Sequence, residues 1–315
     1  MTYPYTIGII TWWEDGERVV SLASATEVEK ALRDASFEVV VFDMPRDWNR
    51  FESVLSAQAL SFVFLMIHGT WGEDGELVSV LDMYHVPYQC AARDILQLTI
   101  DKRTTKQVWR QAWLPVANDM LILPLECAVE QLSQRIVQEI GFPCVRKVLA
   151  QWSSNWVHII EDKDWLEAVM TLYAHYTEQV LIESFLQGDE ITVWLLEQPD
   201  GTVTALPITL IIPPREGGFD FANKYNGKTQ EICPAPLSAP LTEQCQQLAV
   251  DSYTAVWCQK YARVDMIITW DGPVLLEINT IPGFTSQSLY PKAAQAAWIP
   301  FCKLLEHLME VGSRR

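Results

Sequence analysis

The sequence has few basic residues and no long apolar run. Lysine and arginine number 23 against 40 aspartates and glutamates, so the formal net charge is −17 and the pI is near 4.7. A nucleic-acid surface is not expected, because neutralising phosphates requires clustered cations. No apolar stretch approaches the roughly 18 residues that span a bilayer, and no basic segment precedes the first apolar run. We expect no membrane partner and a cytoplasmic location.

Several motifs that identify common sites are also missing. The seven cysteines are an odd number without CxxC or Cys/His metal spacing, which predicts reduced thiols. The absence of GxxxxGK[ST] excludes a P-loop, and no GxGxxG follows a predicted strand. We find no internal repeat and no low-complexity tract.

Strand and helix patterns alternate near the N-terminus. Residues 5–13, 38–44 and 60–69 read as strands, and residues 21–37 read as a helix capped by Ser21 or Ser24. This order predicts an α/β fold with a parallel sheet, in which binding groups collect beyond the carboxyl ends of the strands. The loop "HGTWGEDGE", residues 68–76, lies at such an end. It is a candidate pocket wall or, because of its glycines, an ordinary turn.

A length of 315 residues suggests about two domains, or three small ones. A boundary is expected near residues 94–102, where a helical run begins. A second α/β unit follows, with strands in 143–149, 156–160 and 179–186 and a helix in 163–176. A third region starts at about residue 183. It contains the strand 189–197, an irregular segment, the helix 241–259, a hairpin and the closing helix 299–311.

The hairpin, "RVDMIITWDGPVLLEIN", carries polar residues where a core would be expected. Asp271-Gly272 is a turn signal. If the loop has an odd number of residues centred on Asp271, Asp265 lies opposite Glu277 and Arg263 lies opposite Asn279. Side-chain alternation then places these four residues and Leu275 on one face, and puts Val264, Met266, Leu276 and Ile278 on the core face.

Two carboxylates and an amide oxygen at close range repel one another unless a cation neutralises them, and magnesium is the simplest candidate. The plain alternative is that Arg263 pairs with one carboxylate while the rest of the face is solvated. Lys102, at a helix start, and Lys147, at the end of an apolar strand, can each direct a cation at phosphate. Taken singly, each is more often a surface lysine. Together with a magnesium site they fit a nucleoside triphosphate.

The segment "NTIPGFTSQSLYPKAA", residues 279–294, joins a strand to a helix. Hydroxyls at 285, 286 and 288 can cap this helix, and backbone N–H groups at a helix start bind anions. In the expected order, the chain also contains "ERVVSL", "HGTWGEDGE", "IDKRTTK", "LIESFLQGDEITV" and "NKYN". With the hairpin, these motifs closely resemble the D-alanine–D-alanine ligases of the ATP-grasp superfamily. The resemblance covers nearly the whole chain, and residues 263–292 are its most specific part.

The resemblance implies a three-domain ATP-grasp fold, with ATP between the central and C-terminal domains. We expect domains at 1–98, 99–182 and 183–315. By position, the resemblance implies a site for two magnesium ions, with Mn²⁺ as a substitute, at Asp265, Glu277 and Asn279. The residues implied to bind ATP are Lys102, Lys147 and Lys224 at the phosphates, Glu183 and Leu186 at adenine, and Glu190 at ribose.

For the amino acid substrates, the resemblance implies that Arg263 and the N–H of Gly283 stabilise an oxyanion. Glu17 is implied to bind the ammonium of the first D-alanine, and Ser288 the carboxylate of the second. Ser153 and Tyr225 would link to Glu17 as a lid, and Ser21 and His68 complete the expected substrate residues. The implied reaction is ATP-dependent formation of D-alanyl-D-alanine through an acyl phosphate, for peptidoglycan precursor synthesis. A homodimer is compatible with the family.

The chain departs from the family pattern at four places. "TWWEDGE" replaces a small, glycine-rich first turn, "QCAARD" replaces a glycine-containing turn, and Gln287 replaces a histidine. In the phosphate lid, "KVLAQWSSNW" keeps the serines and lacks the glycines, which brings Trp152 and Trp156 into that segment. Two alternatives therefore stay open: an ATP-grasp ligase for other amino acids or dipeptides, and a catalytically weakened, ligase-derived nucleotide- or peptide-binding protein.

Overall fold

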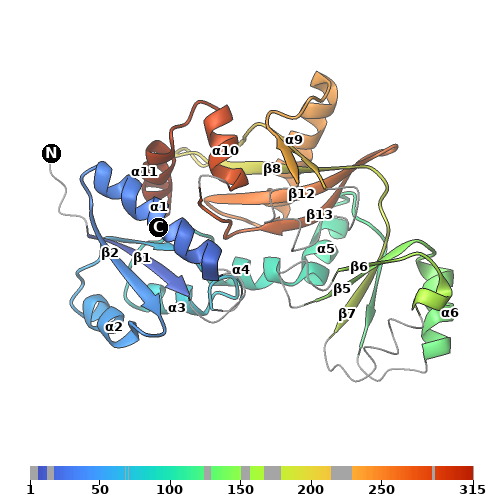
Figure 1. The fold of residues 1–315 in the computed structure, drawn as a ribbon, viewed down its shortest axis with the longest axis horizontal. Helices are drawn as coiled ribbons and strands as arrows, with labels where there is room; N and C mark the ends of the chain where they lie inside the picture. The colour runs from blue at the N-terminus through green and yellow to red at the C-terminus, as the bar shows by residue number, and fades with distance from the viewer. Residues whose placement is uncertain are drawn as a thin grey trace.

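Three β-sheets organise the chain in the computed structural model (Figure 1), which describes residues 6–12, 18–67, 69, 71–123, 129–149, 157–166, 179–213, 229–285 and 288–314. The first sheet has three strands in the order β2-β1-β3, the second has four in the order β4-β7-β5-β6, and the third has six. Helices cover these sheets, and none of them in the described ranges is long and apolar enough to cross a membrane.

The N-terminal sheet is parallel, as the alternating pattern predicts. Its strands are regular and apolar, and the helices between them pack on its faces (Figure 1). The elements are β1 (Thr6–Trp12), α1 (Arg18–Asp34), β2 (Glu38–Met44), α2 (Trp48–Ser56), β3 (Phe62–Leu65) and α3 (Glu76–Met83).

Helix α1 begins at Arg18, so the predicted cap at Ser21 or Ser24 is wrong. Both serines are buried inside the helix, and both serve tertiary contacts instead. The Ser21 hydroxyl donates to the carbonyl oxygen of Met66, and the Ser24 hydroxyl accepts from the backbone N–H of Phe284 at 3.1 Å. These serines therefore connect α1 with the carboxyl end of β3 and with the loop after the hairpin.

The second sheet is antiparallel and has a small core of its own, which includes Met120, Ile136 and Ile182. Two helices, α4 (Arg93–Ile100) and α5 (Lys102–Gln111), precede it where one helical run was expected. Asp101 separates them, since it ends α4 and caps α5. The elements of this unit are β4 (Asp119–Ile122), α6 (Val129–Glu139), β5 (Cys144–Val148), β6 (His158–Ile160) and β7 (Val180–Ser184).

The third sheet has the order β11-β10-β8-β12-β13, with β9 paired to β8. Its hairpin and long helix follow the prediction, whereas three short strands in and before the irregular segment were not predicted. The elements are β8 (Asp189–Glu197), β9 (Val203–Ala205), β10 (Thr209–Ile212), β11 (Gln230–Ile232), α9 (Ala239–Ala255), β12 (Tyr261–Thr269), β13 (Gly272–Asn279), α10 (Leu289–Ala296) and α11 (Phe301–Gly312).

The first and third sheets share one continuous apolar core. Helix α11, near the end of the chain, packs on α1, which lies near the beginning of the chain (Figure 1).

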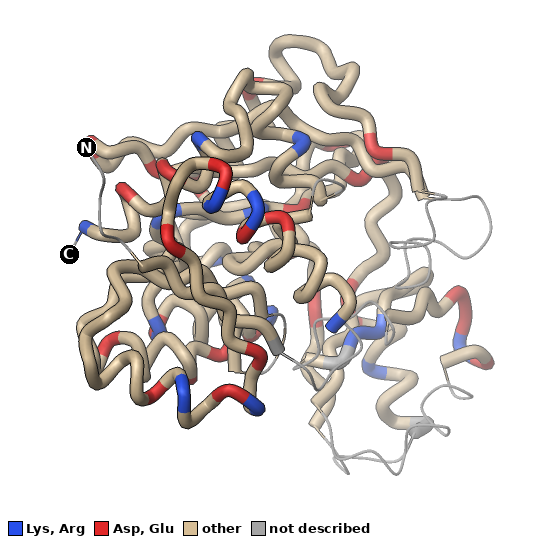
Figure 2. The backbone as a smooth tube through the Cα atoms, turned by 60° about the vertical axis from the view of Figure 1, so that its left-hand side comes forward, with Lys and Arg blue, Asp and Glu red and all other residues tan. Residues whose placement is uncertain are grey.

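Charged residues of both signs are distributed along the chain, and Figure 2 shows acidic and basic positions interspersed along the backbone in that view. The six cysteines in the described ranges are free thiols, and burial raises the pKa of Cys90 to about 12.

Candidate functional site

The polar residues of the hairpin meet as the sequence predicts. In the antiparallel pairing of β12 with β13, Asp265 lies opposite Glu277 and Arg263 lies opposite Asn279. Asp265 and Asn279 are buried, at 9% and 8% exposure. Two carboxylates and an amide are therefore held close together by backbone register alone.

The route to this register differs from the prediction. The loop has two residues, 270 and 271, because Thr269 pairs with Gly272, and a shift between Asp265 and Met266 restores the expected polar pairs. The extra residue at this bulge reverses the expected placement of two leucines. Leu275 is fully buried opposite Met266, whereas Leu276 is partly exposed, so the assignment of Leu276 to the core face was wrong.

Arg263 neutralises part of this cluster. Its guanidinium donates to both Asp265 carboxylate oxygens at 2.8 to 3.1 Å, and one nitrogen lies 3.9 Å from Glu277. The side-chain oxygen of Asn279 accepts from the backbone N–H of Ile281 at 2.9 Å, which fixes the amide at the start of the following loop.

Helix α5 brings a second cation to the hairpin. Asp101 caps the helix by accepting from the backbone N–H groups of Arg103 and Thr104 at 2.9 and 3.1 Å. The cap sets the first turn so that Lys102, at 9% exposure, places Nζ 2.8 Å from the Glu277 carboxylate. The predicted phosphate-binding lysine thus lies beside the predicted metal ligand.

A third carboxylate, Glu183 on β7, lies between two lysines. Lys147 Nζ is 2.7 Å from one Glu183 oxygen, and Lys106 Nζ contacts the other. Burial alone would raise the pKa of Glu183, but the two lysines outweigh it and lower the pKa to about 2. Burial lowers the pKa of Lys106. Burial also acts to lower the pKa of Lys147, but Glu183, Glu277 and Glu190 together outweigh it, so the pKa of Lys147 is raised. Glu183 is therefore ionised at neutral pH.

Lys106 was not predicted as a site residue. It stands in the quoted segment "IDKRTTK", four residues after Lys102, so both lysines project from the same face of α5. That spacing could have identified Lys106, although its partner Glu183 is distant in sequence.

The segment after β7 also reaches the hairpin strands. Glu190 lies on β8 and pairs with Ile267 of β12, and Leu186 is partly buried in the preceding turn. Between them, Gly188 packs on the backbone of Ile268, because a Cβ added at Gly188 would lie 2.1 Å from the Ile268 carbonyl oxygen. The segment that joins Leu186 to Glu190 is thus packed closely on β12 of the third sheet.

The loop from β13 to α10 contains Gly283 and Ser288. Ser288 occupies the N-cap position of α10 but makes no capping bond; its hydroxyl instead accepts from the backbone N–H of Thr285 at 3.0 Å and contacts the Thr285 hydroxyl at 2.8 Å. A Cβ added at Gly283 would lie 2.9 Å from the Ser288 hydroxyl oxygen. The predicted oxyanion and carboxylate residues are therefore direct neighbours.

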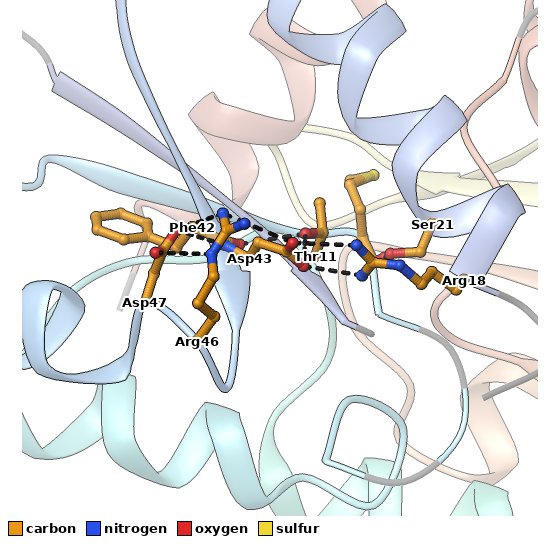
Figure 3. A network of polar contacts seen from close by, with 8 residues as sticks. Thr11, Arg18, Ser21, Phe42, Asp43, Arg46 and Asp47 are labelled. Carbon is orange, nitrogen blue, oxygen red and sulfur yellow. Dashed lines mark hydrogen bonds and ion pairs between the residues drawn. The ribbon is translucent and has the colours of Figure 1, made fainter. Parts of the chain in front are cut away.

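A polar network fixes the start of α1 at the carboxyl ends of β1 and β2 (Figure 3). The Arg18 guanidinium donates to both Asp43 oxygens at 2.9 and 3.1 Å, and the hydroxyl of Thr11 donates to Asp43 at 3.2 Å. Arg46 lies 3.7 Å from the same carboxylate. Hydrogen bonding to Arg18 lowers the pKa of Asp43. This pair holds the helix that carries Ser21 and adjoins Glu17 in sequence.

Five predicted site residues lie outside the described residues: Glu17, His68, Ser153, Lys224 and Tyr225. The expected lid tryptophans, Trp152 and Trp156, and Gln287 also lie outside them. The predictions for these residues stay predictions.

The second and third sheets meet where lysines of α5 and β5 face carboxylates of β7 and β13. With the parallel N-terminal sheet, this arrangement is the ATP-grasp fold. The family described as "D-ala D-ala ligase C-terminus" matches residues 108–310. The D-alanine–D-alanine ligase of Desulforudis audaxviator (strain MP104C) is 34% identical over 311 residues, covering 98% of this chain and 99% of the relative. The chain belongs to the D-alanine–D-alanine ligase family.

Solved structures agree with this assignment. The D-alanine–D-alanine ligase from Bacillus anthracis matches with a TM-score of 0.83 and 30% identity, covering 98% of this chain and 97% of that one. The same bacterium's ligase complexed with ATP matches with a TM-score of 0.81 and 28% identity, with the same coverage.

Proposed function

We propose that this protein joins two D-alanine molecules into D-alanyl-D-alanine at the expense of ATP, for peptidoglycan precursor synthesis in the cytoplasm. The contact that carries the proposal is the Lys102–Glu277 pair of 2.8 Å beside the Lys147–Glu183 pair of 2.7 Å. Lysines of α5 and β5 meet carboxylates of two sheets there, in a chain that matches a D-alanine–D-alanine ligase over nearly its full length. The proposed domains, 1–98, 99–182 and 183–315, each contain most of one sheet, although the second boundary falls within β7.

The donor set of the hairpin fits magnesium. Asp265, Glu277 and Asn279 offer only oxygen ligands, which hard divalent cations prefer. The described residues contain no group of three or more His, Cys, Asp or Glu that could hold a metal, and the proposed site combines two carboxylates with the Asn279 amide. These three residues would hold two magnesium ions, or Mn²⁺ in their place, and the ions would neutralise charge on the transferring phosphate.

The remaining residues bind and orient the substrates. Lys102 and Lys147, with Lys224, contact the phosphates of ATP. Glu183 and the backbone at Leu186 contact adenine, and Glu190 contacts ribose. The γ-phosphate is transferred to the carboxylate of the first D-alanine, and the amine of the second attacks the acyl phosphate and releases inorganic phosphate.

Arg263 and the Gly283 N–H stabilise the oxyanion that forms during this attack, because preorganised donors act where charge develops. Glu17 holds the first D-alanine and Ser288 the second, with Ser21 and His68 beside them. Ser153 and Tyr225 close over the site, which protects the acyl phosphate from water.

One observation favours a second candidate, a ligase for other amino acids. The first turn reads "TWWEDGE", so two tryptophans replace the small residues expected beside the first substrate. The test is phosphate release with ATP and magnesium across a panel of D- and L-amino acids, with products identified by mass spectrometry. D-Alanyl-D-alanine is the expected product. Ligation of L-amino acids with none of D-alanine would support the second candidate, and no turnover with any pair would indicate a binding protein.

A further inference from the structure

Helix α5 directs two buried lysines at two different sheets. Lys102 contacts Glu277 on β13 of the third sheet, and Lys106, one turn later, contacts Glu183 on β7 of the second sheet. The side chain of Lys106 is 1% exposed and that of Glu183 is 3% exposed. The pair therefore lies in the interior, where a charge without a partner is costly.

Glu183 has two cationic partners that differ in access. The Lys147 side chain is 14% exposed, compared with 1% for Lys106, and Lys147 is also attracted by Glu277 and Glu190. Lys147 is thus on the side of the proposed ATP site, whereas Lys106 is enclosed. Two lysines share the Glu183 carboxylate, so the more accessible one, Lys147, can turn to an anion while Lys106 stays with Glu183.

We propose that Lys106 is a positioning residue that holds the Glu183 carboxylate while Lys147 exchanges Glu183 for a phosphate of ATP. The inference rests on the proposed function. If Lys147 were the sole cationic partner of Glu183, moving it to phosphate would leave a buried carboxylate without a positive charge beside it. With Lys106 in place, Glu183 keeps one cation, and ATP does not have to offset that loss.

The test uses the full-length protein and measures the Kd of Mg-ATP by calorimetry, the KM of ATP and of D-alanine, and thermal melting. We expect Lys106→Met to weaken Mg-ATP binding and raise the KM of ATP by about tenfold or more, as in typical site-to-site coupling. The KM of D-alanine should stay within about twofold of wild type. Lys106→Arg keeps the charge and should restore most of the ATP affinity.

The control is Lys260→Met, which removes a partly buried lysine outside the proposed ATP site. Lys260 donates to the carbonyl oxygen of Tyr88 at 2.9 Å, and burial lowers the pKa of its ammonium as it does for Lys106. This control should lose stability but keep the ATP affinity of wild type.

A neutral residue at position 183 separates positioning from a purely structural role. In Lys106→Met, Lys147 is the remaining cationic partner of Glu183 and is held away from the phosphates. Adding Glu183→Gln frees Lys147, so the double variant should bind Mg-ATP more tightly than Lys106→Met at neutral pH. A folded Lys106→Met protein that binds Mg-ATP like wild type would overturn the inference and leave the proposed function standing. A wild-type protein that binds no Mg-ATP would overturn both.

If Lys106→Met does not fold, the double variant with Glu183→Gln provides the test, because it removes both buried charges. It should bind Mg-ATP within about twofold of Glu183→Gln alone, since an uncharged residue 183 needs no cation. A further loss of about tenfold or more would overturn the inference.

Discussion

Lys102 on α5 and Glu277 on β13 form an ion pair of 2.8 Å that joins the helix before the second sheet to the hairpin of the third. We expect Glu277→Gln to reduce turnover by at least about 100-fold, because even residues that only orient metal ligands cost 10- to 100-fold. The melting temperature should change little, because two effects offset each other. The variant loses the ion pair with Lys102, and it also loses the repulsion between the Glu277 and Asp265 carboxylates. Near-normal turnover at saturating magnesium would instead show that the polar face of the β12–β13 hairpin is a solvated surface without a role in catalysis.

Glu183→Gln should destabilise the protein in a pH-dependent way. At pH 7 we expect a loss of about 3–5 kcal/mol in the free energy of unfolding, because two buried lysines lose their carboxylate. The folded-state pKa of Glu183, about 2, lies below the unfolded value, so its stabilisation is present above about pH 4.3 and is lost as the pH falls towards 2. Urea unfolding of both proteins at pH 7 and pH 3 measures this, and a difference that grows in acid would contradict it.

Gly283→Ala should impair use of the second D-alanine. The new Cβ would lie 2.9 Å from the Ser288 hydroxyl oxygen and force that side chain to move. We expect the KM of D-alanine at the second site to rise by about tenfold while the KM of ATP stays unchanged. Gly201→Ala is the control: it strains a positive φ of 85° with no atom near its Cβ, and should reduce stability alone. An unchanged KM of D-alanine would separate Gly283 from the substrate.

Gly188→Ala should affect both stability and ATP binding. Its Cβ would meet the carbonyl carbon and oxygen of Ile268 at 2.7 and 2.1 Å, and backbone cannot move aside as a flexible side chain does. We expect a loss of about 1–3 kcal/mol in stability, together with a higher KM of ATP because Leu186 and Glu190 flank the glycine. Thermal melting and ATP titration test this. Wild-type stability with normal kinetics would show that the segment at Gly188 can move away from β12 without cost.

The hairpin shows how far the sequence could predict the site. The predicted pairing of Asp265 with Glu277 is confirmed, but it forms because a bulge offsets the difference in loop length. The two-residue loop and the bulge were not predicted, because they depend on how Leu275 packs against the core rather than on local pattern. The predicted register is therefore correct for Arg263 and Asp265 and wrong by one residue between the bulge and the turn.

Contacts between residues distant in sequence account for two further differences. Ser21 and Ser24 resemble helix caps, but α1 begins earlier, at Arg18, whose partner Asp43 lies on another strand. In the same way, the interior pair of Lys106 with Glu183 joins residues from separate elements. A local pattern identifies the residue types, and only the fold determines which of them pair.

The separate apolar core of the second sheet has a consequence for motion. Because the first and third sheets share one continuous core while the second has its own small one, the second unit is expected to open as a cooperative unit while the rest stays folded. Amide hydrogen exchange should therefore be faster in β5 and β6 than in β8 and β12. A nucleotide bound between the second and third sheets would slow amide exchange most in the second sheet. Nucleotide binding would therefore be detected as slower exchange in β5 and β6.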